Sequence, residues 1–532
     1  MRNTELMDRF LRRAEPWMFL VLLIAQLAVI WSLPAFLTLD GPGHIYNMHA
    51  LSDLLANDHS VYAPWYEPNL APLPNWISYV LAQPVLNLFS PAQIEQWLVS
   101  WSVIALAMGF RYFFRSIDSA KPWGSWLIFF FTFHGPLLNG FLNFSIGLGV
   151  AFFALGQLIR AWERTDARRL IAFAVILVVL YFSHFVAFGL FAFAAIGVGF
   201  SWLMDALRKG RNEFQVFGKK AGMLLLAALP AGAWCVWYVV IDNQSSQKFY
   251  LSTQEIIAVF TDDMGLKTYN PNELLYLRWI WIATAAGLFL QFIAMRFFGA
   301  GRAEKSSHQR GWLWATLIVA AMAFVLPNGT SGGGIVTFRV VLTAYILFFS
   351  WCLWWIAHTY IRLAVLVVIL IVGFDHLRAT WHYEEGLQSR IGAIMKAGAG
   401  MAPQSVLAVV DFDQVWPFNH VPSYVGCAHN QPMTVVLGGQ KFFSPLRFKG
   451  DLFSEPMIEQ LEVNPALVNP IIAEQTLPSP PDYWLCMGIP ERAIADTSAA
   501  RRWQSFFSES CVLLAGDSVH KVFVYQRYHP DQ

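Results

Sequence analysis

Long apolar stretches alternate with short polar segments over the first 375 residues of the chain. The first stretch, residues 17–37, is long enough to cross a bilayer as a helix. Together with the stretches that follow, it predicts about eleven membrane-spanning helices. The later stretches lie at residues 94–113, 123–138, 141–158, 170–183, 186–203, 221–240, 274–297, 312–325, 341–358 and 363–374. The predicted fold class is therefore a mainly α, polytopic membrane protein.

The positions of Lys and Arg predict how these helices are oriented. Most cations fall in alternate loops, on the same side as the N-terminus. Because cations are enriched in cytoplasmic loops, we expect a cytoplasmic N-terminus and a first span retained as a signal-anchor. The segment before the first span contains Arg2, Arg9, Arg12 and Arg13. The predicted outer loops before residue 375 contain Lys248, Lys267, Arg278 and Arg339.

The sequence changes character near residue 375, where mixed polar and apolar residues replace the long apolar stretches. We expect a transmembrane domain at residues 1–375, with a first outward loop at 38–93, and a soluble α/β domain at 376–532. Strands are predicted at 406–410, 483–487, 512–515 and 519–525, and helices near 458–461 and 499–507. Residues 76–89 are apolar but short and contain Pro84, so we expect an interfacial helix there. If the last span, 363–374, does not cross, the C-terminal domain would be cytoplasmic.

Composition agrees with a membrane location. The 532 residues are 56% hydrophobic and 13% charged, and the mean hydropathy is +0.45, which excludes an ordinary soluble protein. The net charge of +1 gives no basic surface for nucleic acid. Cys235 and Cys352 lie in apolar stretches as packing residues, whereas Cys427, Cys486 and Cys511 leave open one disulfide with an odd thiol.

The first outward loop carries the strongest candidate chemistry. Asp40, His44 and His49 follow the first span within the segment Thr38-Leu-Asp-Gly-Pro-Gly-His-Ile-Tyr-Asn-Met-His49. If the segment is helical, Asp40 and His44 are neighbours and can form an acid–base pair. A divalent metal there is left open, and the alternative for Asp40 is a helix cap with no chemical role.

Further polar residues collect in the predicted outer loops. Asn139, Asn143 and His184 lie at the turns of two hairpins, and Arg339 follows Gly332-Gly333-Gly334. An outward Arg can bind a phosphate with two hydrogen bonds, or it can extend toward lipid headgroups. His184 can equally be a hairpin residue, and the two asparagines can bind a ligand or join helices. Polar groups gathered on one side predict a cleft that opens outward.

These motifs resemble the GT-C superfamily of integral membrane glycosyltransferases, most of all an uncharacterised bacterial branch. The resemblance covers the membrane part and rests on four short stretches. These are Asp40-Gly-Pro-Gly-His44, Tyr66-Glu-Pro-Asn69 through Pro74-Asn-Trp76, Gly140-Phe-Leu-Asn-Phe144 and Ser183-His184. Many relatives carry a paired Asp-Glu where this chain has Asp40-Gly41, so either one acid suffices or His44 supplies the second function.

The resemblance implies an inverting enzyme of the bacterial inner membrane with a periplasmic C-terminal domain. Its donor would be a sugar on a polyprenyl phosphate, and its acceptor a glycan, a lipid or a protein, in cell-envelope polysaccharide biosynthesis. Asp40 would be the general base with His44 beside it as a catalytic group. Arg339, His184, Asn139, Asn143 and His49 would bind substrate, with Arg339 stabilising the departing phosphate.

Two other classes remain as alternatives to an enzyme. A lipid or polysaccharide transporter would be expected to carry acids in the middle of its spans or broken helices at matched positions. A scaffold for polysaccharide assembly would need no base at all. No cofactor is implied by the residues beyond the open divalent metal.

Overall fold

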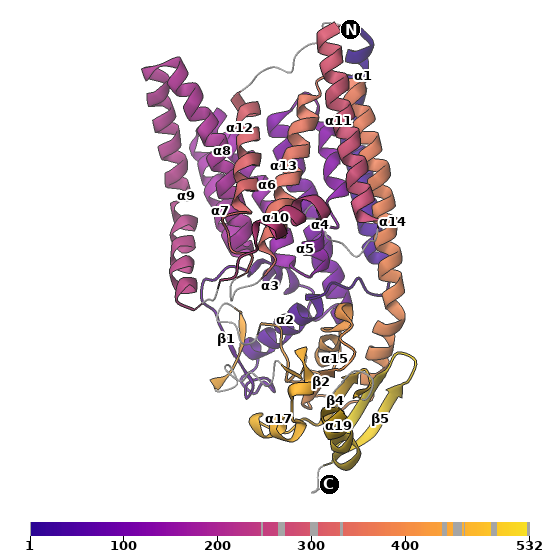
Figure 1. Cartoon of the computed structure of the whole chain (residues 1–532). Coiled ribbons are helices and arrows are strands. Elements are labelled where there is room, and N and C mark those ends of the chain that lie inside the picture. Colours follow the sequence, from indigo (N-terminus) through magenta and orange to yellow (C-terminus); the bar gives the residue numbers. More distant parts are fainter. Residues whose placement is uncertain are drawn as a thin grey trace. The chain divides into compact units, whose positions relative to one another are not determined.

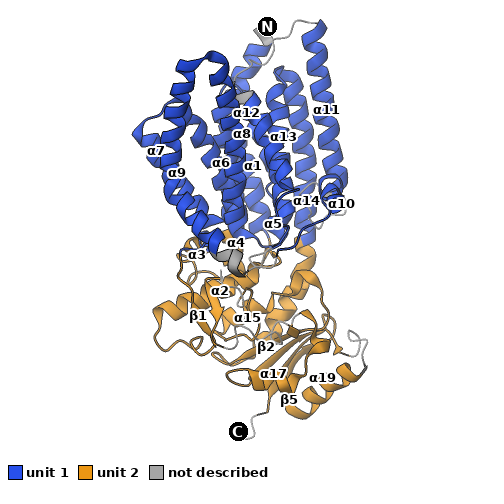
Figure 2. Cartoon of the chain, turned by 60° about the vertical axis from the view of Figure 1, so that its left-hand side comes forward, with its two compact units in different colours: residues 1–32, 72–78, 99–383 blue, residues 33–71, 79–98, 384–532 orange. Residues whose placement is uncertain are grey.

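The structure is a computed structural model and is mostly helical (Figure 1). It describes residues 2–245, 248–263, 266, 272–297, 307–329, 334–438, 444–450, 460–461, 463–490 and 497–528. The chain divides into two compact units, coloured separately in Figure 2. Unit 1 comprises residues 1–32, 72–78 and 99–383, and unit 2 comprises 33–71, 79–98 and 384–532. The functional domains expected at 1–375 and 376–532 stay a prediction.

Eight helices of the described chain are long and apolar enough to cross a membrane, which makes this a multi-pass membrane protein. They are α1 (Arg2–Trp31), α4 (Pro91–Ile117), α6 (Leu142–Glu163), α8 (Phe185–Lys209), α9 (Arg211–Ser245), α11 (Glu273–Phe297), α13 (Val336–Trp355) and α14 (Thr359–Gly398). Two predicted spans form shorter helices, α7 (Ala167–Ser183) and α12 (Ser307–Met322). The short helix α10 (Thr253–Ala258) leads into a π-helical turn, η2 (Val259–Asp263).

One predicted span is not a continuous helix. Residues 123–138 form a 3₁₀ helix, η1 (Pro122–Phe130), and a separate short helix, α5 (Gly135–Leu138). The break lies at residues 131–134, and Pro136 follows it in the first turn of α5, where a missing backbone N–H leaves no helical hydrogen bond unmade. The prediction of about eleven full spans was wrong at this position.

The last span extends well past its predicted end. Helix α14 is 40 residues long and passes through Asp375 without a break. A helix of that length reaches about 60 Å, twice the thickness of a bilayer core. The change in sequence character at residue 375 therefore does not coincide with the end of a helix.

Small residues and buried ion pairs hold unit 1 together. A Cβ on Gly109 would lie 2.0 Å from the backbone oxygen of Gly149, so α4 and α6 approach each other closely. The guanidinium of Arg362 contacts the carboxylate of Asp118 at 2.6 Å, and both side chains are buried. Charged groups are thus paired within the helical unit.

Unit 2 contains a four-stranded sheet in the order β2-β4-β6-β5. Strands β2 (Leu407–Asp411) and β4 (Tyr483–Met487) are parallel, whereas β6 (Val522–Arg527) is antiparallel to both β4 and β5 (Cys511–Asp517). Helix α19 (Thr497–Ser510) packs Trp503 and Phe506 onto Trp484 of the sheet. The four predicted strands and this helix are confirmed, whereas the helix predicted near 458–461 lies mostly outside the described residues.

The remaining elements of unit 2 are short and include those of the segment that follows α1. Helix α2 (Gly41–Ala56) follows Asp40, and β1 (Tyr66–Pro68) pairs antiparallel with β3 (Leu446–Phe448). The other short elements are α3 (Ile77–Ala82), η3 (Trp416–Phe418), α15 (Pro422–Ala428), η5 (Pro465–Leu467) and α17 (Pro470–Thr476). Helix α3 ends just before Pro84, because the residue before a proline disfavours helical backbone.

Candidate functional site

Asp40 occupies the N-cap position of α2, but its carboxylate does not cap the helix. No side-chain cap hydrogen bond forms, and the backbone dihedrals of Asp40 (φ −88°, ψ −7°) are already helical. Its backbone oxygen accepts from the N–H of His44 at 3.0 Å, so the first turn of the helix begins at Asp40 itself. The alternative in which Asp40 serves only as a cap is therefore wrong, because the carboxylate is not used for that purpose.

Two imidazoles lie beside this carboxylate. Nε2 of His420 is 3.6 Å from Oδ1 of Asp40, and both side chains keep partial solvent access. His44 lies one helical turn beyond Asp40, and its Nδ1 is buried without a hydrogen-bond partner among the described residues. Burial lowers the pKa of His44, against the opposing effect of Asp40, so its ring is neutral near pH 7. The structure thus brings Asp40 and His44 together, as the sequence predicts, and adds His420.

Glu95 of α4 holds the segment before Asp40. Its Oε1 accepts from the backbone N–H of Thr38 at 2.7 Å and from the Thr38 hydroxyl at 2.6 Å, and its Oε2 accepts from the hydroxyl of Tyr424. Burial, followed by the charge of Glu95, raises the pKa of Tyr424, so this phenol remains a donor. One buried carboxylate therefore satisfies three donors.

The same carboxylate explains why position 41 is a glycine. A Cβ on Gly41 would lie 1.9 Å from Oε1 of Glu95 and 2.3 Å from Oγ1 of Thr38. A paired acid directly after Asp40 has no room in this chain, because Glu95 fills the space that its side chain would take.

Helix α14 also supports this segment. Oε2 of Glu384 accepts from the N–H of Leu37 at 2.9 Å, and Gln388 bonds both the N–H and the oxygen of Ala35. Sequence reasoning missed Glu95 and Glu384. The signal for Glu95 was present, because a carboxylate at the start of an apolar stretch needs a specific partner.

Helix α2 is joined to the C-terminal sequence by several hydrogen bonds. The amide of Asn47 donates to the oxygen of Leu437 at 2.8 Å, and the hydroxyl of Tyr46 accepts from the N–H of Met433 at 2.9 Å. Nε2 of His49 contacts the side-chain oxygen of Asn430 at 2.6 Å. A substrate contact by His49 stays a prediction.

Arg339 and His184 form a second group, within unit 1. Nη1 of Arg339 lies 3.3 Å from Nε2 of His184, and the guanidinium lies over the rings of Phe141 and Phe144. Nδ1 of His184 accepts from the N–H of Val186 at 3.0 Å, so the ring proton lies on Nε2. Both groups can therefore donate to a single anionic oxygen that binds beside them.

The two asparagines have structural hydrogen bonds in the same unit. The amide of Asn139 donates to the oxygen of Gly135 at 2.8 Å, and the oxygen of Asn143 accepts from the N–H of Ser78 at 2.9 Å. Their contact with a substrate stays a prediction. The one cleft predicted for Asp40, His184 and Arg339 also stays a prediction, because these residues belong to different units.

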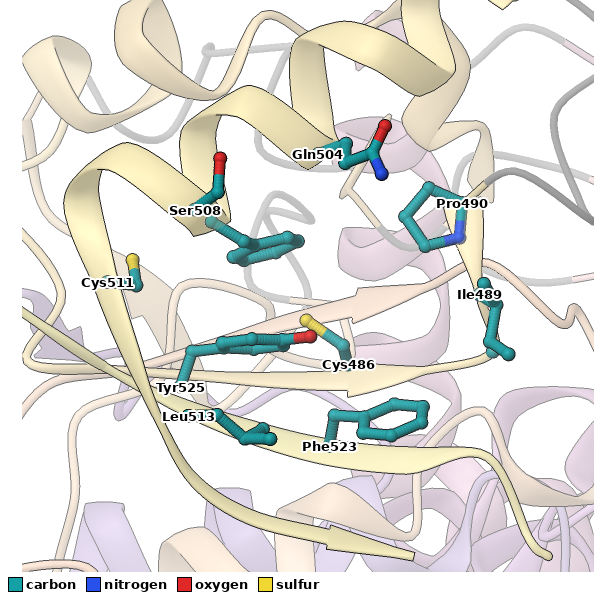
Figure 3. A pocket seen from close by; sticks show the side chains of 11 residues that line it. Cys486, Ile489, Pro490, Gln504, Ser508, Cys511, Leu513, Phe523 and Tyr525 are labelled. Carbon is teal, nitrogen blue, oxygen red and sulfur yellow. The ribbon is translucent and has the colours of Figure 1, made fainter. Parts of the chain in front are cut away.

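The described residues contain no group of three or more His, Cys, Asp or Glu side chains arranged to hold a metal ion. All five cysteines are free thiols, so the disulfide left open by the sequence does not form. A cavity of about 440 Å³ lies between α19 and the sheet and includes Cys486 and Cys511 (Figure 3). Burial raises the pKa of both thiols, in Cys511 to about 12, so neither is a nucleophile near neutral pH.

No protein-family model matches the sequence, and no curated protein matches it. The crystal structure of ArnT from Cupriavidus metallidurans bound to undecaprenyl phosphate is similar over 97% of this chain and 99% of that chain, with a TM-score of 0.52 and 10% identity. The chain has the fold of ArnT. The apo state of ArnT covers 96% of this chain and 98% of its own, with a TM-score of 0.50 and 10% identity. The ArnT likeness confirms the fold that the resemblance to the GT-C superfamily predicts.

Proposed function

We propose that this protein is a membrane glycosyltransferase that moves a sugar from a polyprenyl-phosphate donor to an acceptor, with Asp40 as the general base. The proposal rests on the carboxylate of Asp40. It is partly exposed, is not used as a helix cap, and is accompanied by His44 and His420. A carboxylate held in place but left available is what proton abstraction from an acceptor hydroxyl requires.

The donor class is supported by the fold. ArnT, which shares this fold over nearly the whole chain, binds undecaprenyl phosphate. A polyprenyl phosphate needs apolar helices for its tail and a cation for its phosphate, and the helical unit supplies both. The sugar and the acceptor, whether glycan, lipid or protein, are not specified by the residues described above.

The proposed reaction is a single displacement at the anomeric carbon. The acceptor O–H bond breaks, its oxygen bonds to the anomeric carbon, and its proton goes to Asp40. The bond from the anomeric carbon to the phosphate oxygen breaks in the same step, so the configuration inverts. Polyprenyl phosphate leaves with the electron pair.

Arg339 and His184 are proposed to bind the phosphate. Negative charge on the departing phosphate grows in the transition state, and donors already directed at that charge stabilise it. The guanidinium of Arg339 is fixed between the faces of Phe141 and Phe144, so little side-chain freedom is lost when the phosphate binds. Asn139, Asn143 and His49 complete the proposed substrate contacts.

The proposed location is the inner membrane of a bacterium, with the N-terminus in the cytoplasm and the reaction at the outer face. The distribution of Lys and Arg between alternate loops supports this orientation. A transporter or scaffold function is less well supported, since neither requires the arrangement around Asp40.

Lipid analysis of a deletion strain tests the function. The deletion and the Asp40→Asn strain should both accumulate a polyprenyl phosphate that carries a sugar, measured by mass spectrometry of the membrane lipids. The exposed Asp58, in the same loop, provides a matched Asp58→Asn control that should show no accumulation. Absence of any sugar-linked polyprenyl phosphate in both strains would contradict the proposal.

A further inference from the structure

We infer that His420 is a positioning residue for Asp40, so that the C-terminal sequence supplies part of the reaction centre. This inference rests on the proposed function, because it assigns His420 to the base of that reaction. His420 lies between the 3₁₀ turn η3 and helix α15, far along the chain from the first outward loop. The relationship is therefore created by the fold and not by sequence proximity.

From its position, His420 can orient the carboxylate of Asp40. The 3.6 Å between its Nε2 and Oδ1 of Asp40 is longer than a hydrogen bond, but a small movement on substrate binding would close it. With its ring proton on Nε2, His420 would donate to Oδ1 of Asp40. The other oxygen of the carboxylate then faces the acceptor hydroxyl, and its lone pair is held in one direction.

A buried carboxylate ties the segments that carry Asp40 and His420 to each other. Thr38, two residues before Asp40, donates twice to Oε1 of Glu95, and Tyr424, four residues after His420, donates to Oε2 of the same group. All three side chains are almost fully buried. The distance between base and imidazole is thus set by buried hydrogen bonds, although Asp40 and His420 themselves lie at a partly exposed surface.

The other titratable groups around Asp40 and His420 are His44, Tyr424, Glu95 and Glu384. His44 faces both Asp40 and His420, but burial lowers its pKa and keeps it neutral. Tyr424 stays protonated because burial raises its pKa, and Glu95 and Glu384 are engaged with backbone donors. Burial also raises the pKa of Glu95 to about 7, so Glu95 itself titrates near neutral pH. The role of His420 is therefore tested by the size of kcat and its rescue by a neutral donor, and not by the pH dependence of the rate.

The test uses the purified full-length protein and the sugar-linked lipid isolated from the deletion strain, presented in liposomes with a cell-envelope extract as the acceptor source. Release of polyprenyl phosphate is followed at a fixed pH, with the donor concentration varied to separate kcat from KM, for the wild type, His420→Ala and His420→Gln. His520 provides the control, because it contacts Asp517 at 3.0 Å in a comparable His–Asp pair on the β5–β6 turn. The control variant is His520→Gln.

We expect His420→Ala to lower kcat about 100-fold, the loss that follows from a misplaced reacting group, with KM for the donor almost unchanged. His420→Gln keeps a donor N–H, so it should recover a large part of kcat. His520→Gln should match the wild type in rate.

Two results would overturn the inference. One is an unchanged kcat in His420→Ala, while Asp40→Asn is inactive. The other is an equal loss of kcat in His420→Ala and in a folded His420→Gln protein. If the proposed function is wrong, the wild type itself will release no polyprenyl phosphate. That outcome differs from both results above, in which the wild type is active.

Discussion

Oε1 of Glu95 accepts hydrogen bonds from both the N–H and the hydroxyl of Thr38, at 2.7 and 2.6 Å. Both residues are fully buried. Because Thr38 precedes Asp40 by two residues, this pair fixes the backbone from which the proposed base extends. The position of the base is thus determined by a carboxylate from a different helix, α4.

Removal of the Glu95 carboxylate should destabilise the protein. Glu95→Ala leaves three buried donors unsatisfied, at a cost of about 1–3 kcal/mol each, so a loss of about 3 kcal/mol or more is expected. Glu95→Gln keeps an acceptor for Thr38 and should lose much less. Thermal unfolding in detergent measures both, with the exposed Glu509→Ala as a control expected within about 0.5 kcal/mol of the wild type. A wild-type unfolding midpoint for Glu95→Ala would refute this role.

A methyl group at position 41 should disturb the same segment. In Gly41→Ala the new Cβ would meet Oε1 of Glu95 at 1.9 Å, so either Glu95 or the start of α2 must move. We expect a loss of transfer of about 100-fold, because Asp40 is the adjacent residue. Gly386 in α14 has open space around its Cα, so Gly386→Ala should keep full activity and gain slightly in helix stability. Equal activities of the two variants would show that Glu95 does not constrain Asp40.

Arg339 should act on the donor phosphate. We expect Arg339→Ala to raise KM for the lipid donor and to lower kcat/KM by about 100-fold, since a charge-assisted pair of hydrogen bonds is lost. Arg339→Lys should recover little, because lysine cannot reproduce the planar fork of the guanidinium. The exposed Arg278→Ala is the matched control and should behave as the wild type. Unchanged donor kinetics in Arg339→Ala would remove Arg339 from the site.

The buried His44 should make folding sensitive to acid. Burial holds its folded-state pKa below the ordinary value of 6.5, so the unfolded state binds more protons below that pH. The contribution is fully present above pH 6.5 and is lost as the pH falls toward the folded-state pKa, by at most about 1.4 kcal/mol per pH unit. Unfolding free energies from pH 8 to 5 should fall less steeply in His44→Gln than in the wild type. The exposed His59→Gln serves as a control with the wild-type slope, and an unchanged slope in His44→Gln would contradict this account.

The helical fold and the candidate base could be predicted from the sequence because each depends on local pattern. Apolar length identifies α1, α6 and α13, and Asp40 and His44 are one turn apart on a single helix. The broken helix at 123–138 was missed because hydropathy does not distinguish one long helix from two shorter ones, although Pro136 is typical of a helix start. Strands β2 and β4 were predictable since their apolar residues form short, uninterrupted runs.

The partners of the base could not be predicted, because they come from distant parts of the chain. Glu95, Tyr424 and His420 meet around residues 38–44 only after folding, and no spacing in the sequence connects them. The position of Glu95 at the start of an apolar stretch indicates that it needs a partner, but it does not identify Thr38 and Tyr424 as its donors. Arg339 and His184 were each predicted as site residues from their side-chain chemistry and their positions in the predicted outer loops. Their joint action with Asp40 stays a prediction.

The central claim is that Asp40 is the base of a sugar transfer from a polyprenyl-phosphate donor. It is tested most directly by single-turnover transfer with purified Asp40→Asn and Asp58→Asn proteins in liposomes that contain the sugar-linked lipid from the deletion strain. We expect Asp40→Asn to bind the donor and unfold like the wild type, but to transfer sugar at least about 100-fold more slowly, whereas Asp58→Asn keeps the wild-type rate. Transfer by Asp40→Asn at the wild-type rate would contradict the account.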